Sequence, residues 1–240
     1  MDTQSLGTRG PFVLVHGGWH GGWCWSRVLP RLCAGGRDAY CPTLTGLGER
    51  SHLLTRAVSR DTHVRDVVAA LEYEDLQDVT LVVHSYAGML APDVTVQAAG
   101  RVAVVVYLDA YLPHAGRSCH DYLPPKTVAM LEQLTNGQGE GWRTPPPPLE
   151  DLGVTDAGDL AWATPRLTPH PARTILEPST NGAEGRPQDV YVRVSDWPQV
   201  VEAAERAARY GMAVHQLTEA GHDAMITRPA ELAGLLLAVG

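Results

Sequence analysis

The alternation of short apolar runs with segments of helical period constrains this fold more than any other feature. Two runs, VTLVVHS (79–85) and RVAVVVYLDA (101–110), are almost continuous in Val and Leu, which is typical of strands covered on both faces. Other runs that we interpret as strands are 12–17, 37–44, 189–196 and 212–222. The segments with a helical pattern are 60–76, 86–100, 200–211 and 228–240. This order predicts an α/β fold, with a mostly parallel sheet and helices on both faces.

One long segment, 112–188, interrupts the alternation and contains the proline-rich TPPPPLE. A structureless loop of this length is uncommon in a compact domain. We therefore expect residues 114–188 to form an inserted cap that is not an independent domain, with residues 1–113 and 189–240 as the core. The apolar residues expected to roof a pocket are Tyr122, Leu123, Met130, Leu131, Leu134, Trp142 and Trp162.

Charge and hydropathy exclude several classes of protein. The 240 residues carry a net charge of −8 and no cluster of Lys or Arg, which argues against a nucleic-acid-binding surface. No segment has the apolar length of a membrane span, and the first ten residues do not resemble a signal peptide. We expect a cytoplasmic protein that binds neither nucleic acid nor membrane. A homo-oligomer remains open.

The sharpest chemical signal is LVVHSYAGM (81–89), in which a β-branched strand leads through Ser85 into a helix. A serine on such a turn projects its hydroxyl above the sheet, beside the free N–H groups of the helix. Val83 and Ala87 occupy the two positions at which a nucleophile elbow usually has glycine. On this stretch alone, a nucleophile and an ordinary helix N-cap are both open interpretations of Ser85.

A second signal is EAGHDAM (219–225), which places His222 between the last strand and the final helix. A general base must come from a loop at the same sheet edge as the nucleophile. Ser85 precedes His222 in the chain, as the nucleophile precedes the base in α/β-hydrolases. The two signals together favour a catalytic pair.

The loop VLVHGGWHGGWCW (13–25) has three interpretations: a phosphate cradle, a metal site, or a pocket floor of backbone N–H groups. It lacks the Gly-Lys-Ser/Thr ending of a phosphate loop. His16 and His20 have the spacing of metal ligands on a helix, but a glycine-rich loop does not supply that helix. We expect no metal and no organic cofactor. We interpret His84 as structural and Trp19, Trp23 and Trp25 as core or pocket wall.

The chain also resembles a known family through five motifs that occur in the same order. They are FVLVHGGWHGGWCW, PTLTGLGERSHL, VVHSYAGM, YLDAYLP and GHDAMITRP. Together they resemble the α/β-hydrolase group that includes plant methyl-salicylate esterases and hydroxynitrile lyases, and still more its bacterial esterase-like members. The resemblance covers roughly residues 10–113 and 189–240, and it implies an α/β-hydrolase fold.

The resemblance implies Ser85 as the nucleophile and His222 as the base, with the backbone N–H groups of Gly18 and Tyr86 as the oxyanion hole. Hydroxynitrile lyases of this group need a hydroxyl side chain where this chain has Gly17, and a lysine where it has Asp223. Cyanohydrin cleavage is therefore disfavoured, and the esterase interpretation stands.

Two carboxylates are candidates for the acid that orients His222. Asp109 ends a long apolar strand, and a nearly buried carboxylate there needs a partner. Asp196 follows the strand after which many family members place the acid, but it stands one position earlier than the usual acid. We favour Asp109 over Asp196. Asp223 adjoins His222 in sequence and is expected to have a surface or capping role.

The sequence thus predicts a serine esterase that cleaves a small or medium hydrophobic carboxylic ester, thioester or lactone through Ser85, His222 and Asp109. Its partner would be a small hydrophobic substrate. The alternative is a lyase, cyclase or decarboxylase that uses the same fold and pocket, because a fold does not determine chemistry. A binding protein that has lost catalysis is a third option, against which the intact Ser85 and His222 argue.

Overall fold

The computed structural model describes residues 10–240. The start of the predicted core, and most of the N-terminal segment on which the cytoplasmic prediction depends, lie outside the described residues. The centre is a six-stranded sheet in the order β2-β1-β3-β4-β7-β8, and every neighbouring pair is parallel. Its strands are β1 (Phe12–Val15), β2 (Ala39–Tyr40), β3 (Val79–His84), β4 (Val102–Leu108), β7 (Val190–Arg193) and β8 (Ala213–Gln216).

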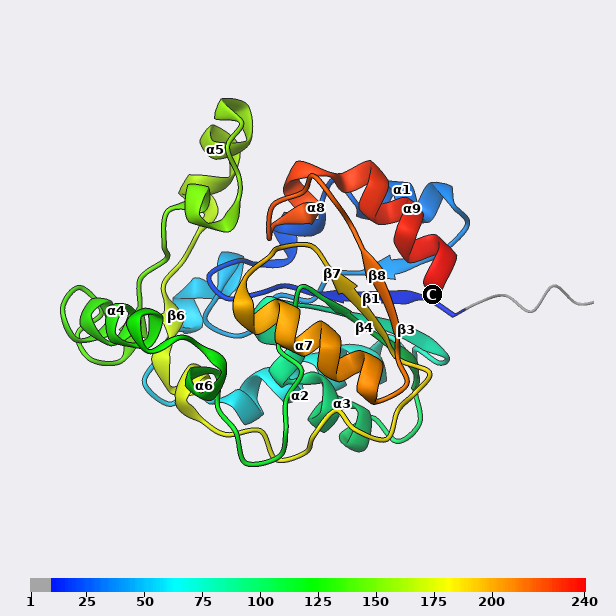
Figure 1. Ribbon diagram of the computed structural model, residues 1–240, viewed down its shortest axis with the longest axis horizontal. Helices are drawn as coiled ribbons and strands as arrows, with labels where there is room; N and C mark the ends of the chain where they lie inside the picture. The colour runs from blue at the N-terminus through cyan, green and yellow to red at the C-terminus, as the bar shows by residue number, and fades with distance from the viewer. Residues whose placement is uncertain (1–9) are drawn as a thin grey trace, which may run out of the picture.

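Helices cover both faces of this sheet (Figure 1), as the alternation predicts. One face carries α1 (Leu29–Ala34), α8 (Ala224–Thr227) and α9 (Pro229–Val239), and the other carries α2 (Arg60–Tyr73), α3 (Ala91–Gln97) and α7 (Pro198–Arg209). Strand β1 shows how one run serves both layers. Phe12 and Leu14 pack in the cluster that contains α1 and α9, whereas Val13 and Val15 pack in the cluster that contains α2, α3 and α7.

Several elements, including the following three, are shorter than their sequence patterns predict. Only Ala39–Tyr40 of the run 37–44 is a strand, because Pro42 has no N–H to extend the ladder. Strand β8 ends at Gln216 within the run 212–222. The segment 86–100 is divided into a 3₁₀ turn, Ser85–Met89, and helix α3. Pro92 stands in the first turn of α3, where a missing N–H costs no hydrogen bond.

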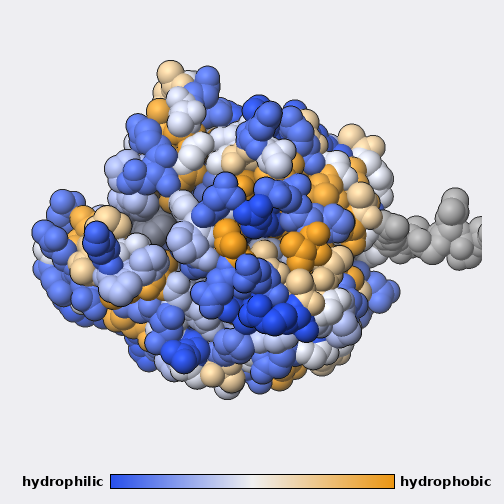
Figure 2. All heavy atoms as spheres, viewed as in Figure 1, coloured by the Kyte–Doolittle hydropathy of each residue, from blue (hydrophilic) through white to orange (hydrophobic). Residues whose placement is uncertain are grey.

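The far edge of the sheet is formed by β8 and covered on one side by α7. Figure 2 shows hydrophilic side chains over the outer face of α7 and hydrophobic ones beside β8, where Val214 is 42% exposed. The inner face of α7 buries Val200, Ala203 and Ala207. Within residues 10–240, no helix combines the length and the apolar character that crossing a membrane would require.

Residues 114–188, which we call the cap segment, lie mostly beyond the carboxyl ends of the strands, and the stretch after residue 176 runs back along the core toward the start of β7 (Figure 1). They contain α4 (Pro125–Asn136), α5 (Ala157–Ala163), α6 (Ala172–Leu176) and a two-stranded antiparallel ribbon of β5 (Arg143–Thr144) and β6 (His170–Pro171). Its short 3₁₀ turns are Cys119–Tyr122, Leu149–Leu152 and Thr164–Arg166. The cap segment is therefore folded against the core at the end of the sheet where loops meet.

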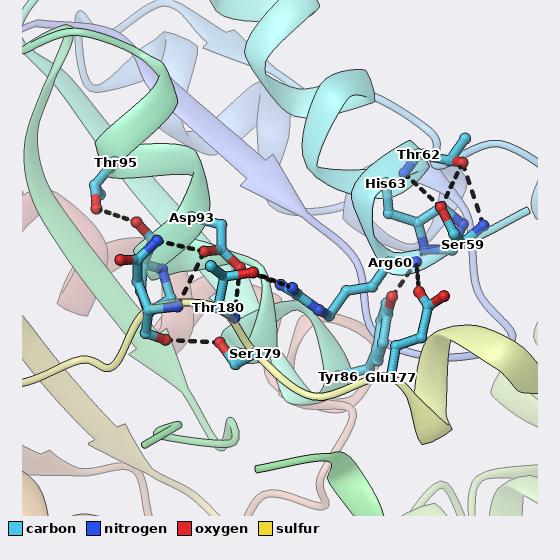
Figure 3. A network of polar contacts seen from close by, with 12 residues as sticks. Ser59, Arg60, Thr62, His63, Tyr86, Asp93, Thr95, Glu177, Ser179 and Thr180 are labelled. Carbon is cyan, nitrogen blue, oxygen red and sulfur yellow. Dashed lines mark hydrogen bonds and ion pairs between the residues drawn. The ribbon is translucent and has the colours of Figure 1, made fainter. Parts of the chain in front are cut away.

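A buried polar network ties the end of the cap segment to the core (Figure 3). Arg60 of α2 forms an ion pair with Asp93 of α3, and both side chains are almost fully buried. Asp93 also accepts hydrogen bonds from the backbone and side-chain nitrogens of Asn181, at 3.1 and 2.6 Å. Thr180 accepts one from Arg60 Nη2 at 3.0 Å. This network holds residues 180 and 181, near the end of the cap segment, against α2 and α3. Arg60 Nε has no hydrogen-bond partner among the described residues.

Candidate active site

Ser85 stands at the carboxyl end of β3 with a φ of +54°. Few residues other than glycine adopt this left-handed conformation, which marks strain at functional turns. The close approaches are supplied by glycines other than the two that the usual pattern requires. A Cβ on Gly17 would lie 2.9 Å from Ser85 Cβ, and one on Gly88 would lie 2.1 Å from the carbonyl oxygen of Tyr111. The elbow thus forms although Val83 and Ala87 occupy the pattern positions.

His222 and Asp109 come together from two sheet-edge loops. The Nδ1–H of His222 donates to Asp109 Oδ2 at 2.7 Å. Asp109 Oδ1 accepts the backbone N–H groups of Val194 and Ser195 at 2.7 and 2.9 Å. Burial alone would raise the pKa of Asp109, but these hydrogen bonds and the neighbouring imidazole lower it below the usual value. The carboxylate is therefore ionised and holds the orientation of the His222 ring.

Asp196 does not reach His222. Its side chain is 86% exposed and pairs with Arg193 Nη1 at 2.6 Å. Trp197, the next residue, is the one that contacts the histidine, with ring centroids 4.4 Å apart. The sequence pattern gives no sign of this aromatic support, because it depends on the direction in which the loop after β7 turns.

Ser85 and His222 line the same cavity of about 340 Å³. Among the described residues, the Nε2 of His222 has no hydrogen-bond partner, so it is available for a proton. The walls are mainly apolar, and three aromatic rings contribute to them, from Trp19, Tyr111 and Trp197. Of the seven cap residues expected to roof a pocket, Leu123, Met130 and Leu131 do line it. Trp162 instead packs on Trp23.

The glycine loop leaves the backbone N–H of Gly18 without a partner among the described residues. His16 Nε2 accepts from the N–H of Leu44 at 3.1 Å, so its Nδ1–H donates to the carbonyl oxygen of Gly17 at 2.8 Å. Burial lowers the pKa of His16 to about 3, which keeps the ring neutral. The N–H of a trans peptide points away from its C=O. The N–H of Gly18 therefore points away from His16, and no described residue accepts it.

The second predicted donor is the N–H of Tyr86, which is the second residue of the 3₁₀ turn Ser85–Met89. The first N–H groups of a helix have no partner within it. The Tyr86 hydroxyl donates to His63 Nδ1 at 2.9 Å, because the His63 Nε2–H is used on the carbonyl oxygen of Thr45 at 2.9 Å. Gly18 and Tyr86 line one small cavity together with Ser85. The residues predicted for the site are thus brought together.

Asp223 occupies the N-cap position of α8, as the capping expectation allowed, but its side chain makes no capping hydrogen bond, and the expected surface location is wrong. Its side chain is fully buried, and Oδ2 accepts from His20 Nε2 at 3.1 Å. The other ring nitrogen of His20 donates to the carbonyl oxygen of Gly18 at 2.6 Å. Burial opposes charge on both groups, but their attraction raises the pKa of His20 and lowers that of Asp223 to about 2. The pair is ionised and anchors the glycine loop.

His84 fills the space between this pair and His222. Its Nε2–H donates to the backbone carbonyl oxygen of His222 at 3.1 Å. Burial, followed by the neighbouring His222, lowers its pKa to about 3, so the ring is neutral. Ligand atoms of His84, His222 and Asp223 lie within 4.8 Å of one another. Each of the three has one of these atoms in a hydrogen bond with the protein: His84 Nε2, His222 Nδ1 and Asp223 Oδ2. Among the described residues, His84 Nδ1 and Asp223 Oδ1 are buried without a partner.

The loop that carries His222 also touches the cap segment directly. A Cβ on Gly221 would lie 2.4 Å from the carbonyl oxygen of Gly153, and Gly153 has a φ of +83°. Only glycine allows two backbones to approach this closely with that conformation. The position of His222 is therefore linked to the end of the 3₁₀ turn Leu149–Leu152.

This fold, and a serine, a histidine and an aspartate arranged at the carboxyl edge of its parallel sheet, are those of α/β-hydrolases. The chain belongs to the alpha/beta hydrolase family, whose model matches residues 12–235. It is 36% identical over 242 residues to the carbendazim hydrolyzing esterase of Nocardioides sp. (strain SG-4G), covering 95% of this chain and 99% of that esterase.

Other relatives are more distant. Methylesterase 10 of Arabidopsis thaliana is 26% identical over 254 residues, covering 94% of this chain and 90% of that enzyme. An extracellular alpha/beta-hydrolase from a Paenibacillus species superimposes with a TM-score of 0.81 at 22% identity, covering 96% of this chain and 98% of that one. At that identity the structural likeness shows a shared fold.

Proposed function

We propose that this protein is a serine hydrolase of small or medium hydrophobic carboxylic esters, thioesters or lactones. One observation carries the proposal. The Nδ1 of His222 is bound to Asp109 at 2.7 Å, while its Nε2 has no partner among the described residues and lies in the same cavity as Ser85. A base with one nitrogen fixed and the other free, beside a serine, is the arrangement that acyl transfer needs.

The reaction follows from this arrangement. Ser85 Oγ attacks the substrate carbonyl carbon as its proton passes to His222 Nε2, and the oxyanion accepts the N–H groups of Gly18 and Tyr86. Asp109 stabilises the imidazolium. Collapse breaks the bond to the leaving oxygen or sulfur, which takes the proton from His222. Water then attacks the acyl-enzyme with His222 as the base, releasing the carboxylic acid and restoring Ser85.

The walls of the cavity support this substrate class. A space of about 340 Å³ is at the small end of ligand pockets. Rings from Trp19, Tyr111 and Trp197 favour a flat or aliphatic apolar group. The relatives named as an esterase and a methylesterase agree with ester cleavage.

A panel of p-nitrophenyl esters, aryl thioesters and lactones of increasing acyl length tests the proposal. We expect turnover of the short and medium apolar members, and loss of that turnover in Ser85→Ala. Ser26→Ala is the matched control, because Ser26 is an exposed serine outside the site. Full activity of Ser85→Ala would contradict the mechanism. Failure of a fluorophosphonate to label Ser85, with turnover retained, would favour the non-hydrolytic alternative.

A further inference from the structure

Trp19 lies in the glycine loop directly after the proposed oxyanion donor Gly18, and it has a φ of +65°. A bulky residue in the left-handed region is a true outlier, so the surrounding structure must hold it there. The contacts that hold it come from the cap segment, more than a hundred residues further along the chain.

All three polar groups of Trp19 are bound by the cap segment. Its backbone N–H donates to His170 Nδ1 in a long hydrogen bond of 3.5 Å, and its indole Nε1–H donates to the carbonyl oxygen of Thr144 at 3.0 Å. Its carbonyl oxygen accepts from the backbone N–H of Thr168 at 2.9 Å and from the Thr168 hydroxyl at 3.4 Å. The cap segment therefore holds both peptide groups that flank Trp19, the one before it through His170 and the one after it through Thr168.

The peptide between Gly18 and Trp19 is fixed at both of its polar ends. Its carbonyl oxygen accepts from His20 Nδ1 at 2.6 Å, while its N–H faces His170. The ring of His170 has one tautomer that fits. Thr174 Oγ1 donates to the carbonyl oxygen of Pro171 at 2.8 Å, so His170 Nε2–H donates to Thr174 Oγ1 at 2.7 Å and Nδ1 is left as the acceptor.

His170 also contacts the other proposed donor. Its ring centroid lies 4.6 Å from that of Tyr86 in an edge-to-face arrangement. The imidazole is fully buried, and burial holds its pKa well below the usual value, so it stays a neutral acceptor. His170 is thus placed between the residue that follows Gly18 and the residue that follows Ser85.

We propose that His170 is a positioning residue for the oxyanion hole, and that Thr168 and Thr144 assist it by holding Trp19. The inference rests on the proposed serine-hydrolase function. It assigns to the cap segment a part in the rate of reaction in addition to its part in lining the pocket. His170 touches no reacting atom. It acts by fixing the peptide between Gly18 and Trp19. This restricts backbone rotation at Gly18, and so the direction in which the Gly18 N–H of the preceding peptide points at the developing negative charge.

Two substitutions at one position test the proposal. His170→Phe keeps a flat ring against Tyr86 but removes the acceptor for the Trp19 N–H. His170→Asn puts an amide oxygen near the place of Nδ1. We expect His170→Phe to lower kcat by about 10-fold to 100-fold, below the loss seen when an oxyanion donor itself is removed, with KM changed by less than about threefold. We expect His170→Asn to recover most of the rate.

A reversible trifluoromethyl ketone, which forms a tetrahedral adduct with serine, separates positioning from a general structural effect. If the oxyanion hole is displaced, the inhibition constant of the trifluoromethyl ketone should rise in proportion to the fall in kcat/KM across the variants. His120→Asn, a cap histidine outside the catalytic cavity, is the control and should change neither. A fall in kcat without weaker inhibition would overturn the proposal, as would an unchanged kcat in His170→Phe.

If His170→Phe does not fold, the same measurements on Thr168→Val decide the matter. That change removes only the hydroxyl that reaches Trp19 O, at the cost of one acceptor for the N–H of Gly48. A parallel loss of kcat and of inhibitor affinity of about threefold supports the proposal, and no change contradicts it. If Ser85→Ala keeps full turnover, the proposed function fails. If Ser85→Ala is inactive while His170→Phe is fully active, only the present inference fails.

Discussion

Two buried histidine–aspartate pairs lie close to each other, and they differ in how the histidine ring is used. His222 is bound to Asp109 at 2.7 Å, and His20 is bound to Asp223 at 3.1 Å. In both pairs the pKa of the aspartate is lowered despite burial. His84 lies between the pairs and contacts both histidine rings, with centroids 4.5 Å from His222 and 6.4 Å from His20.

The difference lies in the second ring nitrogen. In His20 it is used on the carbonyl oxygen of Gly18 at 2.6 Å, so both nitrogens donate and the ring is held in its charged form. In His222 the second nitrogen has no partner within residues 10–240 and faces the cavity that contains Ser85. A histidine–aspartate pair becomes a base only when one nitrogen is left free. The same pair with both ring nitrogens occupied has a structural role only.

The largest expected effect is a split between the two histidines. We expect His222→Gln to lower kcat by about 10⁶-fold, as loss of the base does in serine hydrolases. We expect His20→Gln to keep most of the turnover but to lower Tm, because it loosens the glycine loop without removing a proton acceptor. Ester hydrolysis and thermal unfolding of both variants provide the measurement. An equal loss of kcat in the two variants would remove the distinction.

We expect the same distinction between the two aspartates, with Asp109 affecting kcat and Asp223 affecting stability. Asp109→Asn is expected to lower kcat by about 10⁴-fold, because an amide favours the wrong tautomer of His222. Asp223→Asn is expected to cost about 3 kcal/mol of stability, because it leaves His20 buried without its counter-charge. Comparing kcat with the free energy of unfolding in urea tests both. A larger loss of kcat in Asp223→Asn than in Asp109→Asn would contradict the assignment.

The pH dependence of stability sharpens the comparison. The folded pKa of His20 is raised above its unfolded value near 6.5. The folded state then binds more protons than the unfolded state over that interval, so the stability from His20 is complete below pH ~6.5 and is lost as pH rises through the folded pKa. We expect the advantage in Tm of the wild type over Asp223→Asn to shrink as pH rises above ~6.5. A constant difference would argue against a charged His20.

The smallest effect concerns a carboxylate that lines the catalytic cavity, Asp151. It is exposed, so its influence on a charged substrate is screened by water. We expect Asp151→Asn to weaken the preference for a cationic over a neutral aryl ester by about threefold in kcat/KM. Glu150→Gln is the matched control, because Glu150 adjoins it without lining the cavity. Equal shifts in both variants would show a general effect of charge.

The core fold can be predicted from the sequence because each strand is a local pattern. The β-branched runs that become β3 and β4 have few alternatives to a sheet covered on both faces. Ser85 and His222 can be predicted for a related reason. Each follows a strand, and the carboxyl ends of parallel strands meet at one edge.

The partners of these residues are much harder to predict from the sequence. Asp109 can be favoured over Asp196 only through the expected burial of a strand end, and the contact itself is tertiary. The pair of His20 with Asp223 joins residues 203 positions apart, and the sequence around Asp223 suggested only a surface or capping role. Trp197 and His170 gave no signal, because their roles depend on how two loops fold back onto the site.

The contact of Gly153 with Gly221 has a consequence for how such an enzyme diversifies. The cap segment is the natural place to change the substrate range, since it lines the cavity beside Ser85. Yet one of its glycines rests against the backbone next to His222, at a distance that no side chain tolerates. A chimera that takes this segment from a relative would have to preserve that junction. A change in the cap segment can therefore alter both the substrate range and the position of the proposed base, His222. Library design should hold residues 153 and 221 constant.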